Sequence, residues 1–77
     1  MYDICLGLKN MRTGETRCKE HVKMYSLWGA RCWARKVIQM IDVNFAEIVD
    51  EETGEVMLTL NEDGTTAWDS EGWYEQT

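Results

Sequence analysis

The sequence predicts an α+β domain: one mostly antiparallel sheet of four or five strands, with a single helix packed on one face, in the order β-β-α-β-β(-β). Three observations predict it. Apolar and polar residues alternate near the start and again after the middle of the chain, apolar residues recur every three or four positions between these stretches, and Thr-Gly-Glu occurs twice between alternating segments. The whole chain, residues 1–77, is expected to form one small domain.

The first two strands are expected at residues 2–8 and 16–25. Residues 2–8 alternate regularly, as a half-buried strand does, whereas residues 16–25 alternate less cleanly and carry bases on their outer side. Gly14 lies between them and can adopt the positive φ that short hairpin loops require. These residues therefore predict a hairpin.

A helix is expected over residues 26–41. Ser26 offers a hydroxyl to cap its first turn, and Arg35 and Lys36 lie in its second half, where cations suit the helix dipole. One face carries the apolar residues, at spacings of three and four: Leu27, Ala30, Ala34, Val37, Ile38 and Ile41.

Two further strands, at residues 43–49 and 55–60, are expected to form a second hairpin. Thr53-Gly54-Glu55 repeats the turn chemistry of Thr13-Gly14-Glu15. A third turn, residues 61–64, leads into a short fifth strand at 65–68, and residues 70–77 are expected to fray.

The helix is expected to cover only one face of this sheet. The covered side would hold Ile4, Leu6, Leu8, Val22, Met24, Ala46, Ile48, Val56, Leu58 and Leu60. On the other side Phe45, Val49 and Met57 would face outward beside Glu47. Exposed apolar residues of this kind mark an interface, unless Trp68, Trp73 or Tyr74 folds back to cover them.

Charge is divided along the chain, whose net charge is −6. All eight Lys and Arg residues lie at or before Lys36, whereas residues 42–77 carry eleven acids and no base. Either the two halves neutralise one another across the sheet, or the acids steer the encounter with a charged partner.

Several classes of protein are disfavoured. No apolar run is long enough to span a bilayer, and Met1-Tyr2-Asp3 does not resemble a signal peptide, so we expect a cytoplasmic protein that contacts no membrane. Three cysteines without a C-x-x-C motif predict reduced thiols and no covalent cross-link.

Catalytic and cofactor chemistry are not indicated. His21 is the only histidine and has no nucleophile placed beside it by a known motif, so we expect neither an enzyme nor a cofactor. Cys18, His21 and Cys32 supply only three of the four ligands that structural zinc needs, and no metal site is expected.

A third alternative is a nucleic-acid binder that uses the basic strand and the helix. Arg17, Lys19 and Lys23 would form one stripe, near Arg12 and, on the helix, Arg31, Arg35 and Lys36. The net charge opposes it, because a chain of −6 repels the phosphate backbone.

In length, acidity, single-domain format and exposed aromatic residues, the chain resembles the small phage and mobile-element proteins that inhibit bacterial defence systems, including anti-CRISPR proteins. The resemblance is one of size and charge. It implies stoichiometric binding through an acidic surface that blocks a nucleic-acid site on the target.

We therefore expect a non-enzymatic inhibitor or adaptor that docks on a larger, basic, nucleic-acid-handling protein. The alternative is a homodimer that pairs through its open sheet face or its edge strands. The expected acidic contacts are Glu47, Asp50, Glu51, Glu52, Glu55, Glu62, Asp63, Asp69 and Glu71. The expected apolar contacts are Phe45, Val49, Met57, Trp68, Trp73 and Tyr74.

Overall fold

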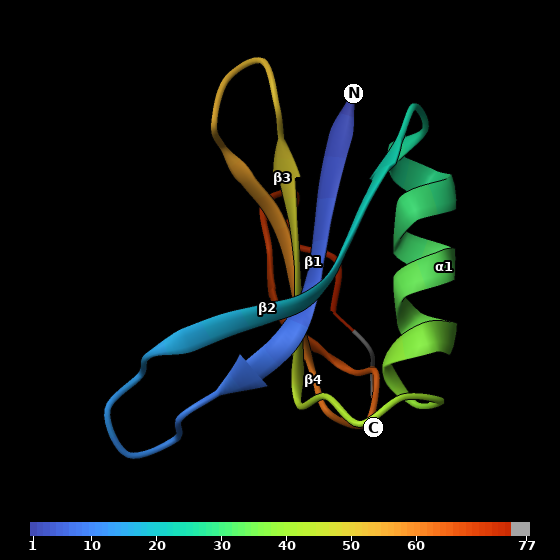
Figure 1. Ribbon diagram of the computed structural model, residues 1–77. Helices are drawn as coiled ribbons and strands as arrows, with labels where there is room; N and C mark the ends of the chain where they lie inside the picture. The colour runs from blue at the N-terminus through green and yellow to red at the C-terminus, as the bar shows by residue number, and fades with distance from the viewer. Residues whose placement is uncertain (75–77) are drawn as a thin grey trace.

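The computed structural model describes residues 1–74 and contains one five-stranded antiparallel sheet with a single helix (Figure 1). The elements are β1 (Tyr2–Lys9), β2 (Thr16–Met24), α1 (Leu27–Ile38), β3 (Phe45–Asp50), β4 (Val56–Asn61) and β5 (Thr66–Asp69). The strands lie in the order β2-β1-β3-β4-β5, and α1 covers one face. The predicted fold class is confirmed, and the sheet has five strands rather than four.

The antiparallel order determines which segments meet at each end of the sheet. We call the end where α1 begins the upper end, as it appears in Figure 1; β1 and β4 begin there, and β2 and β3 finish there. The shorter β5 runs toward this end and finishes opposite Leu58, in the middle of β4. At the lower end α1 finishes and the turn between β4 and β5 lies. Segments far apart in sequence therefore share an end.

The core lies between α1 and the covered sheet face. Its most deeply buried large side chains come from β1, β3, β4 and α1, and they are Ile4, Leu6, Ile38, Ile48, Leu58 and Leu60. Complete burial of one such side chain stabilises the fold by about 1.5–3 kcal/mol. Ala30 and Ala34 on the helix are also fully buried, and their small side chains allow α1 to approach the sheet closely.

The far half of the β1–β2 hairpin, residues 7–20, forms an arm that bends to the side away from α1 (Figure 1). The pairing register shifts between Leu6 and Gly7, as in a β-bulge. A Cβ at residue 7 would lie 1.9 Å from the carbonyl oxygen of Arg17, so only glycine fits there. Leu8, expected on the covered side, lies beyond this bend and is 43% exposed, so that assignment was wrong.

The same register shift explains a disulfide that the sequence reasoning did not expect. Cys5 pairs in register with His21, and Leu6 with Glu20, but Gly7 pairs with Cys18. Lys19 of β2 therefore has no partner residue on β1. The shift turns Cys18 to the face of Cys5, and the two form a disulfide with Cα atoms 5.6 Å apart. The prediction that all three thiols are reduced was wrong, and Cys32 alone is free.

The repeated Thr-Gly-Glu turn is confirmed. The amides of Gly14 and Gly54 each donate to a backbone carbonyl four residues earlier at 2.7 Å, and both glycines have positive φ. The side chains of Asn10 and Asp50 each accept from the amide two residues later, at 2.9 and 3.0 Å. The two hairpins therefore use the same hydrogen bonds from related sequences.

Helix α1 begins as predicted and finishes earlier. The Ser26 hydroxyl accepts from the Gly29 amide at 3.1 Å, which caps the first turn. The helix finishes at Ile38 rather than residue 41, because residues 39–42 turn the chain so that Val43 enters the core beside β3. No helix within residues 1–74 is long and apolar enough to cross a membrane.

The uncovered face differs from the prediction. Phe45 was expected to face outward but is only 5% exposed; it lies in register with Gly7, at the base of the arm. Met57 packs against the core and Val49 is half-buried, so no exposed patch of three apolar residues forms. Trp68 pairs in register with Thr59 and remains 45% exposed.

Candidate functional site: a groove between the helix and the C-terminal segment

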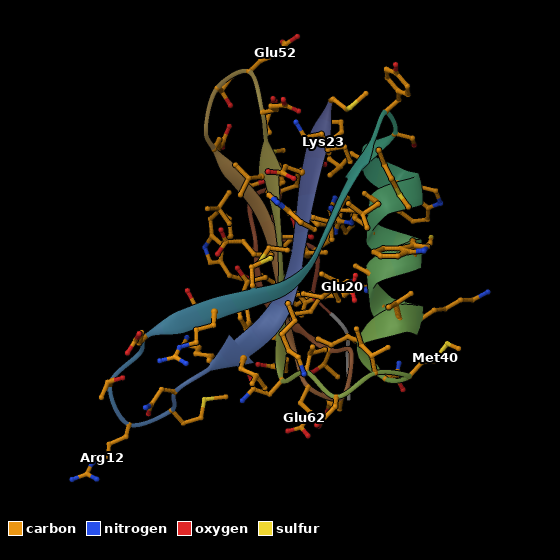
Figure 2. The ribbon with its side chains drawn as sticks, in the orientation of Figure 1. Arg12, Glu20, Lys23, Met40, Glu52 and Glu62 are labelled. Carbon is orange, nitrogen blue, oxygen red and sulfur yellow. A yellow bond between two sulfur atoms is a disulfide. The ribbon has the colours of Figure 1, made fainter. Side chains whose placement is uncertain are left out.

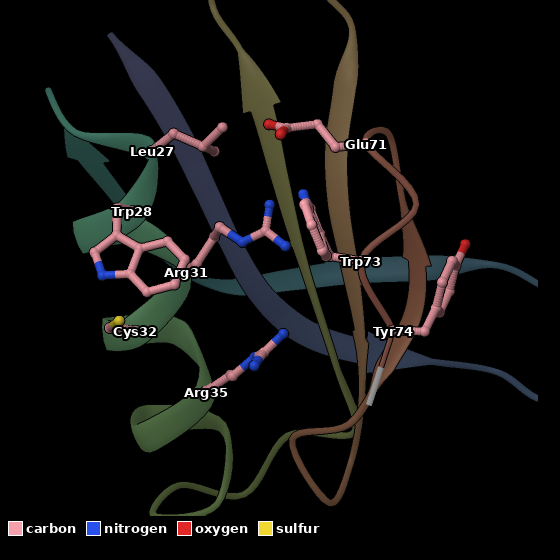
Figure 3. Close-up of a pocket in the computed structure, with 8 residues that line it drawn as sticks. All are labelled: Leu27, Trp28, Arg31, Cys32, Arg35, Glu71, Trp73 and Tyr74. Atoms are coloured by element: carbon pink, nitrogen blue, oxygen red, sulfur yellow. The ribbon is translucent and has the colours of Figure 1, made fainter. Parts of the chain in front are cut away.

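A groove of about 650 Å³ lies between α1 and residues 71–74 (Figure 3). We call it the α1 groove. Five of its lining residues come from the helix and three from the segment that follows β5: Leu27, Trp28, Arg31, Cys32, Arg35, Glu71, Trp73 and Tyr74.

The helix side of the groove is a second stripe, next to the one that enters the core. Trp28, Cys32 and Arg35 follow one another at spacings of four and three and so share a face. Trp28 is 73% exposed, which is unusual for so large an apolar side chain. An exposed tryptophan on a helix is a common anchor for partner binding.

A buried ion pair lies beneath the groove. The Arg31 guanidinium bonds to the Asp69 carboxylate, and these residues are only 8% and 3% exposed. Asp69 was expected to contact a partner, but its burial and this ion pair remove it from the surface. Next to the pair, Arg35 Nη2 donates to Thr66 Oγ1 at 2.9 Å, a second polar link between α1 and β5.

Asp69 also organises the segment that forms the other wall. Its carboxylate accepts from the Glu71 amide at 2.8 Å, its carbonyl accepts from the Gly72 amide at 3.1 Å, and its own amide donates to the Tyr74 hydroxyl at 3.1 Å. These bonds fold residues 71–74 back onto the end of β5. Of the tail expected to fray, residues 75–77 lie outside the described part of the chain.

Two indoles lie on opposite sides of this site. In Figure 3 the rings of Trp28 and Trp73 stand on either side of the Arg31 guanidinium, and Tyr74 lies beyond Trp73. Trp73 is 68% exposed and Tyr74 is half exposed. The groove therefore offers large aromatic surfaces to a ligand. The charge of Arg31 at the centre of its floor is already balanced by Asp69.

The structure divides the predicted acidic residues between the two ends of the sheet. Figure 2 shows Glu52 at the upper end and Glu62 at the lower end. The upper end also holds Asp50, Glu51 and Glu55, in and beside the β3–β4 turn, whereas Glu71 follows β5, whose last residue Asp69 pairs with Leu58 in the middle of β4. Asp63 lies with Glu62 at the lower end, and Glu47 lies on the open face between Cys5 and Thr59. One continuous acidic surface is therefore not formed.

At the upper end some acids form ion pairs or hydrogen bonds, and others form no ion pair with a described residue. Glu51 forms an ion pair with Lys23 at 2.9 Å, and the hydrogen bond and charge of Glu51 raise the pKa of Lys23. Asp50 is half-buried and accepts from the Glu52 amide. Within residues 1–74, no basic side chain forms an ion pair with Glu52, Glu55 or Glu71.

Asp63 at the lower end has a structural role. Its carboxylate accepts from the hydroxyl and the amide of Thr65, at 2.6 and 3.0 Å, and these bonds hold its pKa below the usual range. They close the turn between β4 and β5, where Gly64 has positive φ and packs against Gln39 and the carbonyl of Arg35.

The basic stripe considered for nucleic-acid binding does not form an uninterrupted surface. Lys23 is paired with Glu51, and the Lys19 ammonium contacts the backbone carbonyl of Asp42 at 3.3 Å. Arg17 lies 3.9 Å from Glu15. The bases on β2 therefore each have an acidic residue or a carbonyl beside them.

The residues considered for metal or acid–base chemistry are also separated. Cys18 is bonded to Cys5, and His21 Nε2 lies 2.7 Å from an Asp3 carboxylate oxygen on the open face. Cys32 lines the α1 groove on the other side of the sheet. The described residues contain no cluster of three metal-ligating side chains.

Sequence reasoning identified Trp73, Tyr74 and Glu71 but missed the helix wall of the groove. Trp28 lies one position after Leu27 and Cys32 two positions after Ala30, so both fall beside the core stripe, from which alone the helix face was predicted. The available signal was a tryptophan and a cysteine four residues apart outside that stripe.

Comparison with known proteins found no match. No protein-family model matches the chain, and neither a curated protein nor a solved structure matches it significantly.

Proposed function

We propose that this chain is a non-enzymatic binding protein that docks, by its upper end, on a basic surface of a larger protein and blocks or modulates that protein. The observation that carries the proposal is a set of acids that form no ion pair within residues 1–74: Glu52 and Glu55 in the β3–β4 turn at the upper end, and Glu71 beside the exposed aromatic residues of the α1 groove. Trp28 is near the start of α1, and Trp73 lies two residues after Glu71.

Acids and aromatic residues contribute differently to such an interface. Unpaired carboxylates steer a basic partner and raise the association rate, an effect that salt screens. Tryptophan and tyrosine provide most of the affinity when they enter a fitted pocket. The upper end has both acids and an exposed aromatic residue. At the lower end, the Asp63 carboxylate already accepts hydrogen bonds from Thr65 in its own turn.

The class of target follows from charge. A surface that accepts a cluster of carboxylates is basic, and basic surfaces on large proteins commonly bind nucleic acid. The proposal is therefore of an inhibitor that occupies such a surface in place of phosphate groups, as the resemblance to anti-CRISPR proteins in size and charge also implies.

The proposed compartment is the cytoplasm. The Cys5–Cys18 disulfide lies on the open face and the α1 groove lies on the helix side. Reduction of the disulfide in a cytoplasm should therefore leave the proposed docking site in place.

The test compares two double variants with the same change in net charge. Glu52→Lys with Glu55→Lys alters the upper end and spares the Lys23–Glu51 ion pair, whereas Glu20→Lys with Glu62→Lys alters exposed acids elsewhere. Wild-type chain and both variants are used to capture proteins from a bacterial lysate, and the affinity of each purified candidate is measured at low and high salt.

The proposal expects one partner that the first variant loses and the second retains, with affinity that falls as salt rises. Equal affinity for both variants would show that the upper-end acids do not dock.

The structure weakens the argument for a homodimer that pairs through its open sheet face. It required Phe45, Val49 and Met57 to be exposed together, and Phe45 is buried at the base of the arm. The long edge strand β2 is exposed, but its Arg17, Lys19 and Lys23 are the kind of charged residues that prevent edge-to-edge pairing.

A further inference from the structure

We infer that the α1 groove binds one apolar side chain of the partner, an aliphatic or aromatic residue that is flanked in the partner's sequence by Lys or Arg. The inference rests on the proposed function and adds to it the chemistry of the segment that is recognised.

The shape of the groove indicates the apolar anchor. Its volume of about 650 Å³ is well within the usual range for binding pockets, roughly 300–1,000 Å³, and its walls carry Leu27, Trp28, Cys32 and Trp73. Leu27 is already partly packed against the core, so the wall behind the occupant is fixed. A buried anchor in such a groove removes apolar surface from water on both partners.

Charge complementarity indicates the flanking bases. The Arg31 charge beneath the groove is matched by buried Asp69, so it does not repel an incoming cation as a free arginine would. Figure 3 shows Glu71 at the upper end of the groove and Arg35 at the lower end. A basic residue is therefore favoured beside Glu71, at the upper end of the groove.

The exposed indoles add to this preference. The face of a tryptophan ring attracts an ammonium or guanidinium group, by about 0.5–1 kcal/mol at exposed sites. Trp28 and Trp73 are 73% and 68% exposed, so each ring has free surface that a flanking base can contact. An acidic segment would instead meet Glu71 and the chain's net charge of −6.

Three short synthetic peptides serve as probes: one of alternating Lys and Leu blocks, one with each Leu replaced by Ser, and one with each Lys replaced by Glu. Calorimetry with the full chain should show the Lys/Leu peptide binding at least about tenfold more tightly than either relative, a difference of about 1.4 kcal/mol. Equal binding of the Glu/Leu peptide would overturn the inference.

Three tryptophan variants locate the binding. Trp28→Ala and Trp73→Ala each remove an exposed ring of the groove and should weaken Lys/Leu binding about tenfold or more, while Trp68→Ala removes an exposed ring on the open face and should change nothing. If Trp68→Ala weakens binding as much as Trp73→Ala, the groove is not the site.

Cys32 allows the groove to be blocked without a core mutation. It is the one free cysteine, it is exposed, and it lines the groove, so addition of its thiolate to the double bond of an aromatic maleimide places a bulky group there. Blocked protein should lose Lys/Leu binding, and a Cys32→Ser variant treated with the same reagent should keep it. Full binding by the blocked protein would contradict the inference.

The outcomes separate this inference from the proposed function. If the Lys/Ser peptide binds as well as the Lys/Leu peptide and only Glu52→Lys with Glu55→Lys weakens it, acidic docking stands and the groove inference fails. If the groove variants abolish binding and the charge variants do not, the groove is the site and acidic docking fails. Self-association that Trp73→Ala abolishes would identify a second copy as the occupant and overturn the inference.

Discussion

Arg31 of α1 and Asp69 at the end of β5 form a buried ion pair that joins the helix to the last strand and supports the floor of the α1 groove. The pair also crosses the division of charge, because Arg31 belongs to the basic half of the chain and Asp69 to the acidic half. Together with Lys23–Glu51, it shows that the halves partly neutralise one another. The acids at the upper end that form no ion pair within the described residues, Glu52 and Glu55, are the ones assigned to docking.

Replacement of Asp69 by Asn should destabilise the protein strongly. Asn can still accept from the Glu71 amide, but it leaves the buried Arg31 charge uncompensated, which costs about 3–5 kcal/mol. Urea unfolding measures the loss. Adding Arg31→Met should recover much of it, and a loss below about 1 kcal/mol in the single variant would contradict a buried ion pair.

Replacement of Gly7 by Ala should disturb the arm. The added Cβ would lie 1.9 Å from the Arg17 carbonyl oxygen, so the strands must separate there. We expect a loss of about 1–3 kcal/mol in thermal or urea unfolding. The matched control is Gly29→Ala in α1, where the new Cβ meets only Ser26 at 3.5 Å or more and stability should rise by up to about 1 kcal/mol. Similar effects at both sites would argue against the bulge.

Oxidised protein should contain a single reactive thiol. Mass spectrometry after alkylation without reductant should modify Cys32 and leave Cys5 and Cys18 protected. Replacing both of these by Ser should lower stability by about 3 kcal/mol, the value for a closed loop of similar length. Binding through the groove should be unchanged in that variant, because the disulfide lies on the other side of the sheet. Three modified thiols in the oxidised protein would refute the cross-link.

The β4–β5 turn should weaken in acid through Asp63. Hydrogen bonds from Thr65 lower the pKa of Asp63 in the folded state, so its contribution to stability is present above the unfolded pKa of about 3.9 and is lost as pH falls through the folded value. Thr65→Val should return the pKa of Asp63 toward the unfolded value, as carboxyl NMR titration can measure. An unchanged pKa in this variant would assign the shift to another cause.

The order and type of the elements could be predicted because apolar period and turn chemistry agree along the chain. Each strand and the helix lie within a few residues of the expected bounds, and Gly14 and Gly54 close turns of the same kind. These features depend on local sequence.

Features that depend on one shifted residue could not be predicted. The bulge at Gly7 reverses the side on which Cys18 lies, and strict alternation from Met24 and Val22 places it on the wrong face. The burial of Phe45 depends on the arm that this bulge redirects. Sequence spacing does not report where a register shift occurs.

The residues named from the sequence lie in different places. Glu52 lies at the upper end and Glu62 at the lower end, and Glu71, Trp73 and Tyr74 line the α1 groove, because sequence does not report which strand ends meet. The role of Asp69 depends on Arg31, thirty-eight residues earlier in the chain. Such a pair becomes visible only when the helix is placed beside β5.

The most direct test of the central claim is the movement of the indole N–H signals in an NMR titration of the full chain with the Lys/Leu peptide, and then with the captured partner. The chain has four tryptophans, and each gives its own signal. The account predicts that the signals of Trp28 and Trp73 shift while that of Trp68, on the open face, stays in place. Movement of the Trp68 signal with no change at Trp28 and Trp73 would contradict it.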